Sequence, residues 1–184
     1  MFHPTQPRVM AVLDWELTTL GHPLSDLANM CGSYYMPASD ASSAAPPPPA
    51  HLRGLMGLDL KQHGIPQEHE LLRTYLAGCT LPLTVSLPGQ QELRAPPAAP
   101  NVAAAAADTA TPQAPQAVPW SFFMAMYFFK YAVIAHGIAA RAAAGNAASS
   151  SAHLAKRYVP LLASMCESKL ELLEESSTSF SAKL

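Results

Sequence analysis

The segment VLDWELTTLGHPLSDLA, residues 12–28, gives the clearest indication of how this chain folds and works. The run from Arg8 to Trp15 is rich in β-branched and large apolar residues, which predicts a short buried strand that ends at a carboxylate. Turn-forming residues 3–7 precede it. Met1 and Phe2 are therefore expected to pair with the strand as the first arm of a hairpin.

Apolar spacing predicts that most of the remaining chain is helical. A helix is expected from Leu24 to about Tyr35, with Asp26 in its first turn, where the helix dipole favours a negative charge. A short helix is expected over residues 52–63, and a firmer one over 67–77 that Gly78 should end.

The C-terminal third contains the strongest predicted helix, residues 120–144. Its apolar residues occupy every side, and a helix that is apolar all round is expected to be buried. The Ser149–Ser151 cluster is expected to cap a last helix, which Pro160 should bend early and which should fray from Ser176.

Composition limits the class of protein. The 184 residues are 49% hydrophobic, enough for one core, and the net charge of −2 gives no basic surface for nucleic acid. Cys31, Cys79 and Cys166 are widely spaced, so neither a disulfide framework nor a zinc ribbon is expected. The apolar run from Val118 to Ala140 contains Lys130, which argues against a membrane span.

One domain with four parts is predicted. Residues 1–81 form the strand, the turn and the first helices, and residues 120–175 form a C-terminal helical pair. Between them, residues 82–119 are rich in Pro and Ala and are expected to be a disordered insertion. Residues 176–184 are expected to be a flexible tail.

Asp14 and Glu16 are the candidate metal ligands. Residues two apart in a strand point to the same side, so both carboxylates are expected on one face where the strand leaves the core. Magnesium prefers such oxygen ligands and takes the rest of its shell from water and phosphate. The alternative is that these are two solvated acids that follow the end of a strand.

The segment "VLDWELTTLGHPLSDLA" resembles the metal-binding region of the aminoglycoside phosphotransferase and choline kinase family. Together with "FHPTQPRVMA" before it and "HGIAARAAAGNAASS" later, it is most similar to the kinase-like domain fused to acyl-CoA dehydrogenases. The resemblance implies a mainly α fold with a short β segment at the N-terminus, the C-terminal (large) lobe of a protein-kinase-like fold, incomplete.

The resemblance also implies roles for individual residues. Asp14 matches the aspartate that holds magnesium against nucleotide phosphates, and Glu16 would join the metal shell through water or orient a neighbour. Asp26 matches a structural aspartate at a helix start. His22 departs from the aspartate that the family usually has in this turn.

The implied activity is transfer of phosphate from ATP, with Mg²⁺, to a hydroxyl of a small molecule, with a hydroxyacyl-CoA of fatty-acid breakdown as the implied substrate. No catalytic residue of the family is found in this chain, because the small lobe, the phosphate-holding lysine and the catalytic loop are not recognised. The chain is therefore expected to be inactive alone, and its status as an enzyme stays open. The alternative is a non-catalytic helical module that binds a partner chain, such as a separate small lobe or an acyl-CoA dehydrogenase.

Ala182, Lys183 and Leu184 form a near variant of the Ser-Lys-Leu peroxisomal address. They predict a peroxisomal location. If the match is a coincidence, a cytoplasmic location is expected.

Overall fold

The computed structural model describes residues 1–16, 18–38, 53–79, 81, 83–96, 117–149 and 151–181, with side chains described as far as residue 175. Its elements in chain order are α1 (Leu24–Cys31), the 3₁₀ helix η1 (Gly32–Tyr35), α2 (Glu68–Ala77), β1 (Thr84–Ser86), β2 (Leu93–Arg94), β3 (Val118–Pro119), α4 (Trp120–Ala143), the 3₁₀ helix η3 (Ala152–Arg157) and α5 (Val159–Ser181). The mainly α fold is confirmed.

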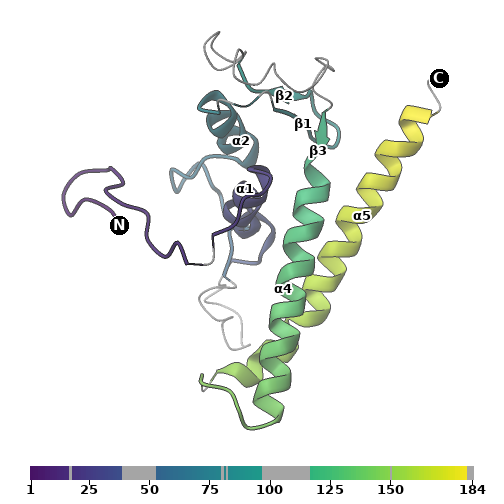
Figure 1. The fold of residues 1–184 in the computed structure, drawn as a ribbon. Coiled ribbons are helices and arrows are strands. Elements are labelled where there is room, and N and C mark those ends of the chain that lie inside the picture. The colour runs from purple at the N-terminus through teal and green to yellow at the C-terminus, as the bar shows by residue number, and fades with distance from the viewer. Residues whose placement is uncertain are drawn as a thin grey trace.

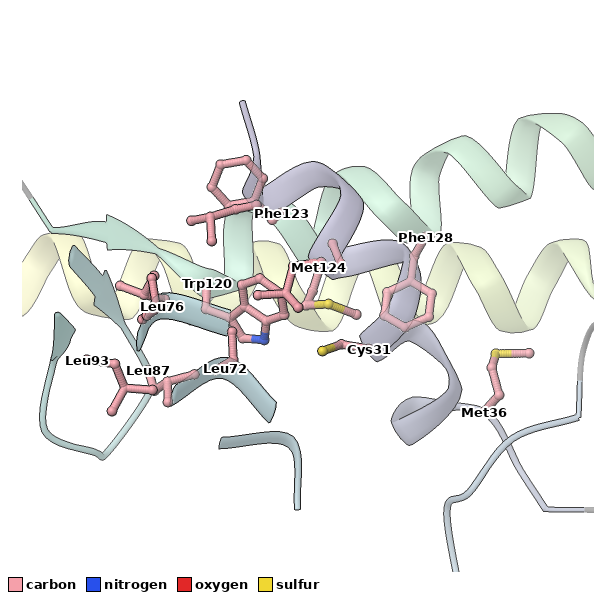
Figure 2. Close-up of a cluster of buried hydrophobic side chains, with 14 of the residues drawn as sticks. Cys31, Met36, Leu72, Leu76, Leu87, Leu93, Trp120, Phe123, Met124 and Phe128 are labelled. Atoms are coloured by element: carbon pink, nitrogen blue, oxygen red, sulfur yellow. The ribbon is translucent and has the colours of Figure 1, made fainter. Parts of the chain in front are cut away.

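The two long helices α4 and α5 lie side by side and are joined at one end through η3 (Figure 1). α1 and α2 lie on the other side of α4, and the small sheet lies near the start of α4. Figure 2 shows the resulting core, where side chains from α1, α2, the sheet and α4 meet. Its largest fully buried side chains are Trp120, Phe128, Leu24, Leu27, Leu72, Leu76, Met124, Leu162, Val85 and Cys31.

The first two helices follow the sequence pattern closely. α1 and η1 together cover the predicted segment 24–35. α2 begins behind a capping box, in which the Gln67 N–H donates to Glu70 Oε2 at 2.7 Å, and it ends at Gly78. The short helix predicted over residues 52–63 is wrong for the described part, because Met56 forms a parallel bridge with Pro37 and residues 57–63 form turns and bends.

The prediction of a disordered insertion over residues 82–119 is wrong at its two ends. β1 pairs antiparallel with β2 and parallel with β3, so residues 84–86, 93–94 and 118–119 form one three-stranded sheet. Val85, Leu87 and Leu93 are buried. These few apolar residues suffice because they pack against the helices, while the surrounding Pro and Ala obscure them in the sequence. Residues 97–116 lie outside the described residues.

The last helix starts later than predicted. The Ser149–Ser151 cluster precedes η3 rather than α5, and the Ser151 side chain makes no capping hydrogen bond. Pro160 is the second residue of α5, where its missing N–H is not needed. It therefore fits the first turn and does not bend the helix.

α4 packs against α1 on one side and α5 on the other but keeps an exposed apolar stripe, which corrects the expectation of a helix buried all round. Phe122, Met126, Phe129 and Val133 are about half exposed, along a stripe with helical spacing. α4 is long and apolar enough to cross a membrane by the criteria of length and composition. The core helix of a globular protein meets the same two criteria. Lys130, in the middle of α4, donates a hydrogen bond to Asn29 Oδ1 of α1 at 2.6 Å.

Candidate functional site

The N-terminal segment forms the predicted hairpin. Phe2 and Val9 make an antiparallel bridge, and the Met1 ammonium donates to the Ala11 carbonyl at 2.7 Å. The turn between the two arms is held by the His3 ring, whose Nδ1 accepts hydrogen bonds from two backbone N–H groups at 3.1 and 3.2 Å. The chain is thus fixed locally before it reaches Asp14.

The buried strand predicted from Arg8 to Trp15 is wrong. Apart from the bridge at Val9, no strand is assigned in residues 8–15, and Val12, Leu13 and Trp15 are 61%, 60% and 63% exposed. A strand needs neighbours on its edges and faces, and among the described residues only the short first arm of the hairpin pairs with this one. The apolar pattern therefore remains on the surface.

Asp14 lies in an unusual backbone conformation. Its φ of +72° places it in the left-handed region, and it is the one non-glycine residue with positive φ in the described part of the chain. The neighbouring turn is held by the Trp15 indole N–H, which donates to the Val12 carbonyl at 2.8 Å, and by the Thr18 N–H, which donates to the Trp15 carbonyl at 3.0 Å. Such strained positions cluster at functional sites, so this geometry singles out Asp14.

Strand alternation, which predicted Asp14 and Glu16 on one face, does not apply to them, because the backbone turns at Asp14. Both side chains are exposed and free to reach an ion. Within the described ranges no group of three or more His, Cys, Asp or Glu side chains is arranged to hold a metal. Two carboxylates nevertheless fit magnesium, which needs only one or two from the protein when phosphate and water complete its shell.

The turn that follows is anchored to the helical core. His22 Nδ1 accepts a hydrogen bond from the Leu24 N–H at 3.3 Å, and the His22 ring lies 4.7 Å from the Phe123 ring of α4. The Tyr75 hydroxyl of α2 donates to the Pro23 carbonyl at 3.4 Å. His22 therefore provides an acceptor at the start of α1, and this turn connects the Asp14 segment to α2 and α4.

Asp26 lies exposed in the first turn of α1, as predicted. Burial, the nearby Cys79 and the charge of Asp26 together raise the pKa of Tyr75. Asp26 thus lies close to the junction of α1 and α2, and its structural role stays a prediction.

A polar cluster around the single carboxylate of Glu68, the first residue of α2, was not predicted from the sequence. The Tyr35 hydroxyl lies 2.7 and 2.8 Å from the two Glu68 carboxylate oxygens, and the Trp120 indole N–H donates to Oε1 at 2.9 Å. The Lys169 ammonium of α5 lies 4.1 Å from the centre of the Tyr35 ring. Burial lowers the pKa of Lys169, and Glu68 partly offsets that shift. No sequence motif marks this cluster, which joins η1, α2, α4 and α5.

One family model matches the N-terminal segment of the chain. Residues 1–47, which contain Asp14, Glu16, His22 and Asp26, match the model of a phosphotransferase enzyme family. This N-terminal segment is thus similar to the phosphotransferase family.

Individual relatives extend the similarity over most of the chain. Acyl-CoA dehydrogenase family member 11 of Rattus norvegicus is 33% identical over 168 residues, which cover 89% of this chain and 16% of that protein. Acyl-CoA dehydrogenase family member 10 of Mus musculus is 29% identical over 165 residues, which cover 90% of this chain and 12% of that protein. The chain therefore spans less than a fifth of the length of these relatives.

A solved structure confirms the kinase-like fold. A protein of Ralstonia eutropha JMP134, provisionally assigned as an aminoglycoside phosphotransferase, superposes with a TM-score of 0.61 and 30% identity. The match covers 93% of this chain and 39% of that chain. The chain is thus similar in sequence and fold to part of this kinase-like protein, and similar in sequence to part of acyl-CoA dehydrogenase family members 10 and 11.

Proposed function

We propose that this chain forms part of an ATP-dependent phosphotransferase domain in which Asp14 holds Mg²⁺ against the nucleotide phosphates. The observation on which this rests is an exposed aspartate in a strained turn, within the segment that matches the phosphotransferase family. A cation at this position would neutralise charge that develops on the transferred phosphoryl group. Glu16 would act through a metal-bound water or by orienting a neighbour.

The proposed acceptor is the hydroxyl of a small molecule. The relatives named as acyl-CoA dehydrogenase family members favour a hydroxyacyl-CoA in fatty-acid catabolism. The terminal Ala182, Lys183 and Leu184, which lie outside the described residues, favour a peroxisomal location for this reaction. The cytoplasm is the alternative if that sequence is not read as an address.

We propose that the chain alone has little or no turnover. One metal carboxylate lowers only part of the barrier, because phosphoryl transfer also needs a base and a clamp that positions the phosphates. The sequence shows no counterpart of either. Assays of ATP consumption with hydroxyacyl-CoA, aminoglycoside and choline acceptors test this, and clear turnover by the 184-residue chain would refute the proposed inactivity.

The metal role can be tested separately from turnover. Mn²⁺, a paramagnetic substitute for Mg²⁺, should broaden the backbone NMR signals around Asp14 at low stoichiometry. Asp14→Asn should abolish this selective broadening, whereas the control Asp59→Asn, at another exposed acid, should leave it unchanged. If Mn²⁺ broadens the same signals in wild type and Asp14→Asn, Asp14 is not the ligand.

A second candidate function is a non-catalytic helical module that binds a partner chain. The observation in its favour is the exposed stripe on α4, Phe122, Met126, Phe129 and Val133. The last three of these residues line a groove of about 440 Å³ between α1 and α4. A separate small lobe or an acyl-CoA dehydrogenase would be the partner. Light scattering after size exclusion, alone and with each partner, distinguishes the two, because a monomer that binds neither argues against this function.

A further inference from the structure

A second cavity lies away from the N-terminal site, where the C-terminal half of α4 faces η3 and the start of α5. Its volume is about 160 Å³. This is the end of the molecule at which α4 and α5 are connected (Figure 1). Ten residues line it: Tyr131, Ile134, Ala135, Ile138, Ser149, Ser151, Ala152, Ala155, Tyr158 and Leu162. None of them lies in residues 1–47, so the cavity is separate from the proposed metal site.

The cavity exists because small residues meet where larger ones would normally fill the space. Ala135 of α4 faces Ala152 and Ala155 of η3, and Ala135 and Ala152 are buried. Leu162 of α5 is 1% exposed and forms part of the wall. Because Ile134, Ser149 and Ser151 are exposed, the cavity is open to solvent on one side and protein covers its apolar wall only in part. A ligand that fills it would remove that apolar surface from water.

The lining determines the chemistry of such a ligand. The walls are made by aliphatic groups and by the half-buried rings of Tyr131 and Tyr158, and none of the described residues that line the cavity is charged. A charged ligand would lose its hydration without gaining an ion pair. Ser149 and Ser151 are exposed and their hydroxyl oxygens lie 2.9 Å apart, so the lining also offers a polar pair at the solvent side.

We propose that this cavity binds a neutral small molecule with an apolar body of about six carbon atoms, the size that an apolar cavity of about 150 Å³ accommodates. A single hydroxyl on the ligand would meet the hydroxyl pair of Ser149 and Ser151. The inference does not depend on the proposed phosphotransferase activity, because it rests only on residues of α4, η3, α5 and the loop between them.

The test uses the full chain with ¹³C-labelled Ile, Leu and Ala methyl groups and benzyl alcohol as the probe. The methyl signals of Ile134, Ile138 and Leu162 should shift and saturate, with a dissociation constant on the order of 0.1–10 mM, as expected for a ligand of few atoms. Benzoate has the same ring but a negative charge, and it should bind at least roughly tenfold more weakly. Shifts that are scattered over the surface, or equal affinity for benzoate, would overturn the proposal.

Two variants locate the ligand. Ala155→Leu places a larger side chain in the cavity and should weaken benzyl alcohol binding by about tenfold or more, while the matched control Ala140→Leu, on an exposed position of α4, should not. Ile138→Ala enlarges the cavity and should shift the preference from benzyl alcohol toward 2-naphthylmethanol. If Ala155→Leu unfolds the chain, Ile138→Ala decides: an unchanged preference between the two alcohols refutes binding at this cavity.

Discussion

Replacing Glu68 with alanine should destabilise the helical assembly more than any substitution of an exposed acid. The carboxylate accepts hydrogen bonds from the Tyr35 hydroxyl and from the Trp120 indole N–H, and it lies close enough to Lys169 to affect its pKa. These partners come from η1, α4 and α5, whereas Glu68 begins α2. A single truncation therefore removes polar contacts that join four elements.

The magnitude follows from the number of donors left without an acceptor. Tyr35 has one hydroxyl proton and therefore counts as one donor, although both Glu68 carboxylate oxygens lie within hydrogen-bond distance. Trp120 is 2% exposed, so water cannot easily replace the carboxylate at its N–H. Each donor left unsatisfied costs about 1–3 kcal/mol. The two donors sum to about 2–6 kcal/mol, and relief of carboxylate desolvation offsets part of this, so we expect Glu68→Ala to lower the free energy of unfolding by about 2–4 kcal/mol.

Urea unfolding followed by circular dichroism and by tryptophan fluorescence measures this loss. Glu68→Gln retains one acceptor oxygen and should lose about half as much. Glu171→Ala, at an exposed position of α5, is the matched control and should change stability by less than about 0.5 kcal/mol. If Glu68→Ala is within about 1 kcal/mol of the wild type, the hydrogen bonds do not contribute as the geometry indicates.

Three other outcomes are expected. Gly32→Ala should destabilise the chain by about 1–3 kcal/mol, because a methyl group there would overlap the Tyr127 ring, whereas Gly21→Ala meets no atom within 4 Å and should be nearly neutral in the same urea assay. Burial and a neighbouring glutamate raise the pKa of the Cys31 thiol to about 12, so at pH 8 iodoacetamide should label Cys31 far more slowly than the half-buried Cys79, as read by mass spectrometry. Burial and a nearby tyrosine raise the pKa of Tyr127 from 10.0 to about 12, so its contribution to stability is fully present below pH 10 and is lost as the pH rises toward 12. Tyr127→Phe cannot ionise and should therefore show a smaller fall in melting temperature between pH 10 and pH 12.

The helices could be predicted because their determinants are local. α2 has its capping box and its terminal Gly78 within one short segment, and α1 follows the turn at His22 and Pro23. The metal candidate Asp14 could be named for the same reason, since its motif is contiguous. Its left-handed backbone could not be predicted, because apolar alternation indicates a strand whether or not neighbouring strands exist.

The small sheet and the exposed stripe of α4 depended on partners distant in sequence. β1 pairs with β3 across a Pro/Ala-rich segment that itself suggests no strand. For α4, an all-round apolar composition predicts burial only when enough elements are present to cover every side. In the described structure α1, α5 and η3 contact α4, and Phe129 is still 56% exposed.

The amino-acid sequence alone determined α1, α2 and α4, the hairpin and the position of the segment that resembles phosphotransferases, because caps, turns and apolar periods act over a few residues. Only the tertiary structure decided that Glu68 meets Trp120, 52 residues away, and that alanines from α4 and η3 enclose a cavity. Such contacts depend on which helix faces pack together. That choice is made by the fit of side chains across the whole core, which no local pattern encodes.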